Sequence, residues 1–349
     1  ILFPPDYPYT SGTTRILREN FAELHAECRS LRLLEPGDLV VDIGSNDGTL
    51  LSNFQADGQR VFGIEPTRAG QLARDRGIET LEAFFGLESA GRARTAAGPA
   101  KMITAANVFA HIEDIHEVVR SLLGLLGEDG VFVSESHYFL SLVETLQYDT
   151  IYHEHLRYYT LHSLQHLLAL HGLEIFHAKR IPTHGGSFRA YAARAGRRPV
   201  LQTVGGMLEQ ERTAGLDAPG LAAFRRRVVA SKLGLHALLC GIRAAGHRIF
   251  GVGAPSRAST LISYVGLDDG IVDCVVEVPG SRKIGKYMPG TLIPVVEESH
   301  LFAEQPEYAL LLSWHIADEL IPKLLQKGFR GRFIVPLPEP RILEGGSRP

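Results

Sequence analysis

The sequence predicts an α/β protein made of two units, each built on a mostly parallel sheet. Three observations lead to this fold class. From Leu39 onward, short apolar runs alternate with amphipathic helical patterns, which is typical of strands joined by crossover helices. The alternation starts again at His247, and both halves open on a strand that runs into a glycine turn. The chain of 349 residues is long enough for two domains of ordinary size.

The first unit is expected to begin with a helix over residues 15–34, where apolar residues recur at near-helical spacing. Five apolar runs then predict strands at residues 39–44, 60–65, 77–82, 101–108 and 130–136. After His137 the pattern changes to an amphipathic helix at residues 161–170. Two further strands follow, at residues 173–181 and 187–194, joined by a turn. An antiparallel pair that closes a parallel sheet is typical of the class I methyltransferase fold.

Helical segments are expected between the two units. Residues 196–246 are rich in Arg and Ala and are broken near Ala214-Gly215 and Pro219-Gly220, which predicts a linker of two helices. The last unit, at residues 247–349, is expected to be a second α/β unit. Its predicted strands are residues 248–254, 271–277, 308–314 and the closing run 333–340. The first unit then spans residues 38–195, preceded by an arm and a helix at residues 1–37.

Composition and charge exclude several classes of protein. The formal net charge of −3 provides no overall attraction to nucleic acid or anionic lipid, and the local run Arg225–Arg227 is typical of a solvated helix face. Three cysteines are too few and too scattered for a disulfide framework or a zinc cluster, which favours a reducing compartment. No run of apolar residues approaches the length of a membrane span. We therefore expect a cytoplasmic protein that binds a small molecule, and neither nucleic acid nor a membrane.

The turn after the first strand has the pattern of a cofactor site. Asp42 ends the strand, Gly44 permits a sharp turn, and Gly48 lets the next helix approach with its N-terminal amides toward a ligand. The spacing differs from the G-x-G-x-x-G of dinucleotide sites, and Glu65 follows about 20 residues later, where an acid reaches ribose hydroxyls. This combination favours S-adenosylmethionine, because its sulfonium and amino-acid tail suit acidic and amide groups. The expected cofactor residues are Asp42, Gly44, Ser45, Asn46, Gly48, Glu65, Pro66, Phe84, Ala106 and Asn107.

Residues 148–159, which follow the fifth strand, concentrate histidine, tyrosine and carboxylate side chains. The segment lacks the spacing of H-E-x-x-H, and no third ligand is evident, so we expect no metal there. A single such residue is often part of a core, but four in a row on a connecting loop favour a functional role. Methylation of carbon beside a carbonyl needs a base to remove a proton and donors to hold the enolate. The segment therefore favours methyl transfer to carbon.

Eight stretches, in order along nearly the whole chain, extend this interpretation: PPDYPYTSGT, DIGSNDGTLL, GIEPT, ANVFAHIED, YDTIYHEHLRYYTL, GGSFRAY, FGVGAPSRASTLISY and KIGKYMPGTLIPV. Together they resemble the sugar C-methyltransferases of deoxysugar pathways in antibiotic producers. The resemblance implies a class I methyltransferase domain followed by a Rossmann-like domain that helps to bind a nucleotide-activated 4-keto-deoxysugar. Methyl transfer would convert S-adenosylmethionine into S-adenosylhomocysteine.

The resemblance also implies which residues carry the chemistry. The base and the enolate-binding groups fall on Tyr152, Glu154 and His155, with His111 and Tyr9 nearby, and His155 is the leading candidate for the base. The residues implied at the substrate are Thr10, Ser11, His184, Gly185, Gly186, Ser187, Arg189, Gly253, Ala254, Arg257, Lys283, Lys286 and Tyr287. Those from Gly253 onward would border the nucleotide or its phosphates.

The sequence departs from the family's pattern in three places. The family usually has an N-terminal cysteine-rich zinc module, and these residues begin just after the position where it would end. Arg257 and Ala258 stand where Lys and Gly are more usual, and His315 stands where Asn is usual. Because the later departures lie on the expected nucleotide side, they concern the nucleotide and the sugar more than methyl transfer. The arm within residues 1–37 would act as a lid over the substrate.

Two other functions stay open from the residues alone. One is methylation of oxygen or nitrogen on another small metabolite, since a Rossmann-like fold does not choose the acceptor. The other is a protein that binds S-adenosylmethionine without turnover. The cluster at residues 148–159 favours carbon over nitrogen because an amine needs less help from a base. A non-catalytic protein would be expected to have lost that cluster.

Overall fold

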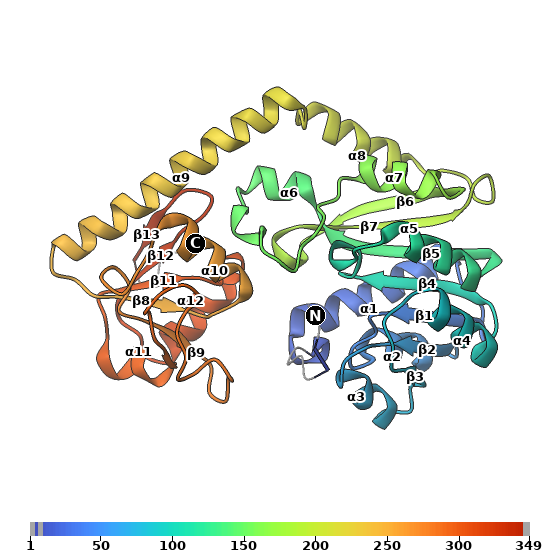
Figure 1. Cartoon of the computed structure of the whole chain (residues 1–349), viewed down its shortest axis with the longest axis horizontal. Helices are drawn as coiled ribbons and strands as arrows, with labels where there is room; N and C mark the ends of the chain where they lie inside the picture. Colours follow the sequence, from blue (N-terminus) through green and yellow to red (C-terminus); the bar gives the residue numbers. More distant parts are fainter. Residues whose placement is uncertain (1–3, 6–9, 345–349) are drawn as a thin grey trace. The chain divides into compact units, whose positions relative to one another are not determined.

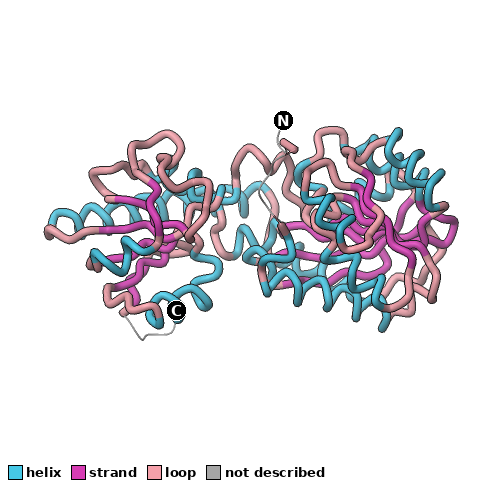
Figure 2. Tube along the Cα trace, turned by 90° about the horizontal axis from the view of Figure 1, so that it is seen from below, coloured by secondary structure: helices cyan, strands magenta, loops and turns pink. Residues whose placement is uncertain are grey.

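The structure is a computed structural model that describes residues 4–5 and 10–344. The chain divides into two compact units. One contains the chain up to Phe139 together with residues 156–214, and the other contains residues 140–155 and the chain from Gly215 onward. Figures 1 and 2 show that each unit has a central sheet with helices packed against it.

The first unit holds a seven-stranded sheet in the order β3-β2-β1-β4-β5-β7-β6. All its strands run parallel except β7, which pairs antiparallel with both β5 and β6. Its elements are η1 (Ser11–Thr13), α1 (Arg15–Ser30), β1 (Leu39–Ile43), α2 (Thr49–Ala56), β2 (Arg60–Ile64), α3 (Ala69–Asp75), β3 (Thr80–Leu81), α4 (Leu87–Ala97), β4 (Ala100–Ala106), η2 (Phe109–His111), α5 (Ile115–Leu125), β5 (Leu126–His137), α7 (Leu161–Ala169), β6 (Leu173–Ile181), η4 (Thr183–Gly185), β7 (Ser187–Arg194) and α8 (Gln202–Thr213). The strands predicted for this unit all form, and the sheet confirms the class I methyltransferase fold.

The second unit holds a six-stranded sheet in the order β10-β9-β8-β11-β12-β13. This is the strand order of a Rossmann sheet, with the last strand antiparallel. Its elements are α6 (Phe139–Glu144), η3 (Tyr148–Thr150), α9 (Ala218–Ala244), β8 (Ile249–Val252), α10 (Ser256–Val265), β9 (Cys274–Glu277), β10 (Val295–Glu297), α11 (Ser299–Glu304), β11 (Tyr308–Leu311), η5 (Trp314–Ile316), α12 (Ala317–Gln326), β12 (Arg332–Val335) and β13 (Arg341–Leu343). The sequence did not predict β10 and β13, because each has three residues and follows directly on a proline, Pro294 or Pro340.

The two units divide the chain differently from the sequence prediction. The expected linker is not a separate part: α8 packs against β6 in the first unit, and α9 buries Leu235 and Leu239 in the core of the second. Residues 140–155, expected within the first unit, belong to the second. The reason is that Leu146 and Tyr148 are buried in its hydrophobic core, each only 3% exposed.

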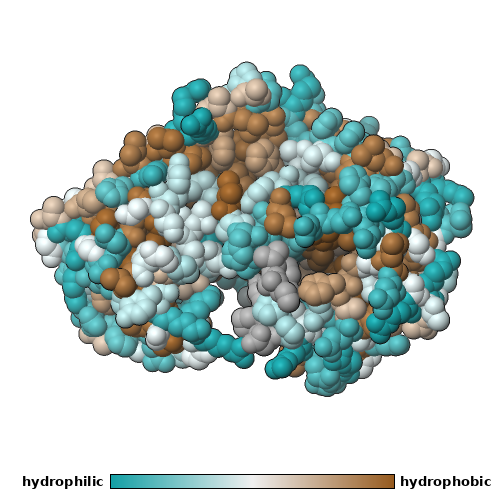
Figure 3. Space-filling view, in the orientation of Figure 1, coloured by the Kyte–Doolittle hydropathy of each residue, from teal (hydrophilic) through white to brown (hydrophobic). Residues whose placement is uncertain are grey.

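The long helix α9 carries the arginine run on its surface. Arg225, Arg226 and Arg227 are exposed, as predicted for a solvated helix face. Apolar side chains also gather along this helix (Figure 3), and Leu233 is 61% exposed. Across residues 4–5 and 10–344, no helix combines the length and the apolar character needed to cross a membrane.

Candidate active site

The glycine loop after β1 has a backbone that only glycine fits. Gly44 has a φ of +70°, and a Cβ there would lie 2.8 Å from the Val108 side chain. Gly48 has a φ of +75° and precedes α2, and a Cβ there would lie 2.7 Å from Ile78. A side chain at either position would be strained and would also clash. The loop therefore keeps its backbone open at the carboxyl edge of the sheet, which is where open α/β sheets bind ligands.

Glu65 lies at the end of β2 beside this loop and is 4% exposed. Its carboxylate accepts hydrogen bonds from the Asn46 amide at 2.9 Å, from the Thr67 amide at 2.9 Å and from the Thr67 hydroxyl at 2.6 Å. A carboxylate offers about four acceptor positions. Its hydrogen bonds within the described part of the chain thus leave room for one more donor, such as a ribose hydroxyl.

Asp42 is buried one strand away and accepts a hydrogen bond of 2.6 Å from the Thr104 hydroxyl. Burial raises the pKa of Asp42 to about 7, and the nearby charges of Glu65 and Glu135 act in the same direction. A cation next to this carboxylate would be favoured electrostatically. The buried Ser45 hydroxyl lies in the same loop and has no hydrogen-bond partner among the described residues. The loop therefore fits a cofactor with a cationic centre, an amino-acid tail and a ribose.

The N-terminal arm packs on this loop. The Ser11 amide donates to Asn46 Oδ1 at 2.8 Å, and the Gly12 amide donates to Asp47 Oδ2 at 3.0 Å. A Cβ on Gly12 would lie 2.6 Å from that Asp47 oxygen, so the arm can come this close only as glycine. Thr10 directly precedes these contacts. Tyr9, predicted near the base, lies outside the described residues.

The end of β4 borders the glycine loop from the other side. Ala106 ends the strand, Asn107 follows it, and the Asn107 amide donates to the Glu135 carbonyl at 2.8 Å. His111 ends the short η2 turn just beyond them. Pro66 directly follows Glu65. Phe84, between β3 and α4, is 60% exposed, and no observation ties it to the loop.

The acid–base segment holds His155 in one tautomer. His155 Nδ1 lies 2.9 Å from the Thr150 carbonyl oxygen, which only accepts, so the neutral ring carries its proton on Nδ1. His155 Nε2 is then the basic atom, and the Tyr152 hydroxyl lies 3.4 Å from it. Glu154 is half-buried, whereas His153 is exposed. The arrangement suits proton transfer at Nε2 of His155.

The chain that follows His155 returns to the first unit beside His111. The Leu156 and Arg157 amides both donate to the Ala110 carbonyl, at 2.8 and 3.2 Å. Ala110 directly precedes His111 in the sequence. That His111 and His155 approach the same pocket stays a prediction from the sequence.

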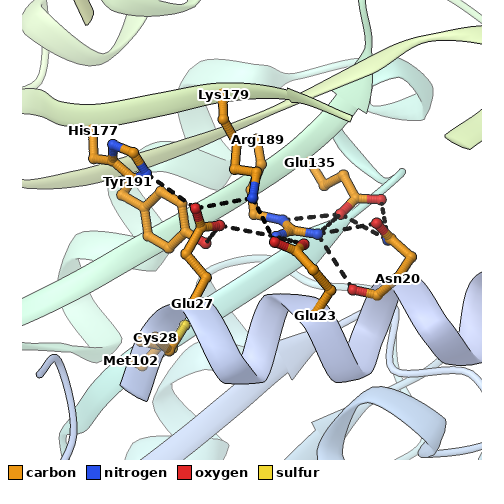
Figure 4. A network of polar contacts seen from close by, with 10 residues as sticks. All are labelled: Asn20, Glu23, Glu27, Cys28, Met102, Glu135, His177, Lys179, Arg189 and Tyr191. Atoms are coloured by element: carbon orange, nitrogen blue, oxygen red, sulfur yellow. Dashed lines mark hydrogen bonds and ion pairs between the residues drawn. The ribbon is translucent and has the colours of Figure 1, made fainter. Parts of the chain in front are cut away.

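Arg189 has a different role from the predicted one. It reaches from β7 to α1 and β5 (Figure 4) and is fully buried. Its guanidinium donates to Glu135 at 3.1 and 3.2 Å, to Glu23 at 2.6 Å, to Glu27 at 3.0 Å and to Asn20 at 3.1 Å. These acceptors engage all three guanidinium nitrogens, so Arg189 ties α1 to the sheet and does not serve as a substrate contact.

The carboxylates around Arg189 respond differently to burial. Burial raises the pKa of Glu135, although Arg189 and Asn20 act to lower it. Burial also acts to raise the pKa of Glu27, but hydrogen bonds from His177, Tyr191 and Lys179 outweigh it and lower that pKa to about 2. Glu135 is therefore the carboxylate that depends most on its cation. Sequence reasoning missed Asn20 and Glu135, because nothing local marks them as partners of Arg189.

The turn before β7 is a tight backbone feature. His184, Gly185 and Gly186 all have positive φ values, of 56°, 84° and 118°. The fully buried Ser187 hydroxyl donates to the Thr183 carbonyl at 3.0 Å. Ser187 thus stabilises the turn, which corrects its predicted contact with the substrate.

Arg257 also differs from its prediction as a nucleotide contact. It is 7% exposed and pairs with Asp149, a fully buried carboxylate that sequence reasoning did not single out. Lys283 donates from Nζ to the Ala254 carbonyl at 2.6 Å, which places its cation beside the Gly253 turn. Lys286 and Tyr287 are exposed on the loop that follows β9.

Comparisons with known proteins agree along nearly the whole chain. A family model described as a methyltransferase domain matches residues 14–178, and one described as a C-methyltransferase C-terminal domain matches residues 182–338. The C-methyltransferase NovU of Streptomyces niveus is 36% identical over 351 residues, which cover 98% of this chain and 82% of NovU.

Two solved structures show lower similarity. The magnesium protoporphyrin IX methyltransferase ChlM of Synechocystis PCC 6803, with bound SAM, is 14% identical with a TM-score of 0.39, covering 51% of this chain and 79% of its own. The CcbJ methyltransferase of Streptomyces caelestis is 11% identical with a TM-score of 0.42, covering 55% and 95%.

Proposed function

Because the chain belongs to the S-adenosylmethionine-dependent C-methyltransferases, we propose that its acceptor is a nucleotide-activated 4-keto-deoxysugar, methylated on the carbon beside the ketone. The observation that carries this proposal is the tautomer of His155, whose basic Nε2 lies beside the Tyr152 hydroxyl. A carbon acid requires such a base, whereas an amine does not. The product would belong to natural-product sugar biosynthesis.

In the proposed mechanism His155 Nε2 takes the proton from the carbon beside the ketone. Tyr152 and His111 donate hydrogen bonds to the ketone oxygen as it gains negative charge. Bound S-adenosylmethionine would supply the electrophilic methyl group for the new carbon–carbon bond, and the neutral thioether S-adenosylhomocysteine would be the leaving group. Glu154, next in sequence to His155, is proposed to belong to the same acid–base group.

The cofactor is assigned to the glycine loop, with Glu65 at the ribose and Asp42 at the cationic end. The loop's backbone, the remaining acceptor position on Glu65 and the raised pKa of Asp42 support this assignment. Thr10 and Ser11, on the arm above the loop, are the proposed substrate contacts of the first unit. Gly253, Ala254, Lys283, Lys286 and Tyr287 are those of the second, with two cations suited to a diphosphate.

Transfer from S-adenosylmethionine labelled with ¹³C in its methyl group tests the proposed acceptor. The probe is thymidine diphosphate-4-keto-6-deoxyglucose, and we expect a product whose labelled methyl resonates in the aliphatic region and couples to a ring carbon. A methoxy resonance would instead indicate transfer to oxygen. The absence of any labelled sugar with this probe and its uridine diphosphate counterpart, under conditions where the cofactor binds, would count against a keto-sugar acceptor.

Glu65→Ala should weaken the binding of S-adenosylmethionine by about 10- to 100-fold, because a hydrogen bond to a charged group contributes about 1.5–3 kcal/mol. Titration calorimetry measures this change. Glu65→Gln keeps the size of the side chain and one acceptor oxygen, which can still accept from Thr67, so it controls for a collapsed loop. Glu82→Ala, which removes an exposed acid from the same unit, should leave affinity unchanged. Wild-type affinity in Glu65→Ala would reject the assignment.

A further inference from the structure

A buried ion pair lies where the strand order of the second sheet reverses. The chain passes from β8 to β9 on one side and from β11 to β12 on the other, so the reversal falls between β8 and β11. Ligands of open α/β sheets ordinarily bind at this point. Here Arg257 comes from the first turn of α10, which follows β8, and Trp314 comes from η5, which follows β11. Between them lies Asp149 of η3, a residue of the same unit.

The contacts of Asp149 define its position closely. Arg257 Nε donates to Oδ2 at 2.8 Å and Arg257 Nη2 donates to Oδ1 at 2.7 Å, which is a bidentate pair. Trp314 Nε1 donates to Oδ2 at 2.7 Å, and the Arg257 guanidinium lies 4.9 Å from the centre of the Trp314 ring. Arg257 Nη2 also donates to Gln147 at 3.2 Å. A buried ion pair often adds little to the free energy of unfolding. A bidentate pair does fix the orientation of its carboxylate, so its effect here is to hold Asp149 in place.

The ion pair connects to His155 through one residue. Thr150 directly follows Asp149, and its carbonyl is the acceptor that keeps the proton of His155 on Nδ1. The Thr150 hydroxyl donates to the Gln147 carbonyl at 2.9 Å, and the Thr260 hydroxyl of α10 donates to the Ile151 carbonyl at 3.3 Å. The peptide that orients His155 is thus held from both sides by the same structure that binds Asp149.

We propose that Asp149, Arg257 and Trp314 form a clamp that positions the Thr150 carbonyl. The clamp thereby keeps the proton of the neutral His155 ring on Nδ1 and leaves Nε2 free of a proton. The inference rests on the proposed function, in which His155 is the base. It assigns the part of the second sheet's edge between α10 and η5 to the chain's own catalytic segment. Arg257 then neutralises Asp149 and is not a phosphate contact.

Asp149→Asn tests the clamp, because it keeps the shape of the side chain while presenting an NH₂ group to the donors of Arg257. In the full chain labelled with ¹⁵N-histidine, His155 is identified as the signal lost in His155→Ala. We expect wild-type His155 with a protonated Nδ1 and an unprotonated Nε2, and Asp149→Asn with a mixture of both tautomers. Deuterium exchange into the thymidine diphosphate-4-keto-6-deoxyglucose probe, without methyl donor, should slow about 10- to 100-fold at saturation, since misplacing a reacting group by 1 Å costs about that much.

Asp273→Asn is the matched control within the same unit. Asp273 accepts two hydrogen bonds from Arg243, at 2.9 and 3.1 Å, and one from the Ile249 amide, at 2.9 Å, far in sequence from His155. It should lower stability without changing the His155 tautomer or the exchange rate. If Asp273→Asn slowed deuterium exchange as much as Asp149→Asn, the effect of Asp149 would come from stability alone, and the proposal would be overturned.

Trp314→Phe provides a second, milder variant that decides the question if Asp149→Asn does not fold. It removes one donor to Asp149 and keeps an aromatic ring over Arg257, and we expect exchange to slow about tenfold. A folded variant of either kind with the wild-type tautomer and rate would overturn the clamp. If His155→Ala kept the wild-type exchange rate, His155 would not be the base. The proposed function would then be rejected, and a catalytic role for the clamp would be rejected with it.

Discussion

Replacing His155 by alanine should slow exchange of the substrate's acidic proton with solvent deuterium by about 10²–10⁴-fold, the usual effect of removing a general base. The experiment uses the thymidine diphosphate-4-keto-6-deoxyglucose probe without methyl donor, so that it reports proton removal alone. A proton beside a ketone is too weakly acidic to leave unaided at neutral pH. His155 is suited to the task because its Nδ1 is bonded to the Thr150 carbonyl and its Nε2 is basic.

Variants of two neighbouring residues show whether the loss of exchange is specific to His155. His153→Ala removes an exposed histidine two residues away and should keep the wild-type exchange rate. Tyr152→Phe removes the hydroxyl that lies 3.4 Å from His155 Nε2 and should slow exchange less than His155→Ala does. Loss of exchange in Tyr152→Phe alone would move the role of base to the tyrosine. A folded His155→Ala with the wild-type rate would exclude His155.

Arg189→Met should destabilise the first unit by about 3–5 kcal/mol, because it leaves the buried carboxylate of Glu135 without its cation. Urea unfolding measures the free energy, and hydrogen exchange in peptides of α1 locates the loss. Arg197→Met is the matched control, since Arg197 pairs with Glu128 at 3.3 Å on the surface and should cost little. A change below about 1 kcal/mol in Arg189→Met would contradict the role of the network.

The cost of Arg189→Met should depend on pH in a defined direction. Burial already raises the pKa of Glu135, and loss of Arg189 removes the main influence that lowers it. A carboxyl group whose pKa is raised by folding stabilises the fold below its unfolded pKa and loses that contribution as pH rises through the folded value. The deficit of the variant should therefore be larger at about pH 8 than at about pH 6. Arg189→Met/Glu135→Gln should recover part of the loss at the higher pH.

The geometry of the proposed cofactor loop was predictable because the signals for it are local. A short apolar run defines β1, a positive φ requires glycine at Gly44 and Gly48, and an acid at the end of the next strand defines Glu65. Each of these features depends on a few neighbouring residues, so it can be identified from the sequence before the fold is known. The histidine segment was predictable as chemistry for the same reason, although its tautomer was not.

The sequence by itself determined the two α/β units, the glycine loop and the composition of the acid–base segment, since these follow from periodicity and local backbone requirements. Only the tertiary structure decided which polar groups meet. Arg189 pairs with Glu23 across 166 residues, and Arg257 pairs with Asp149 across 108. Both arginines were predicted as substrate contacts, because the sequence does not show whether an arginine will pair with a carboxylate of the folded protein. Burial decides the partner of each arginine, because a charge removed from water is stable only when it pairs with an opposite charge or hydrogen-bond acceptors within the protein.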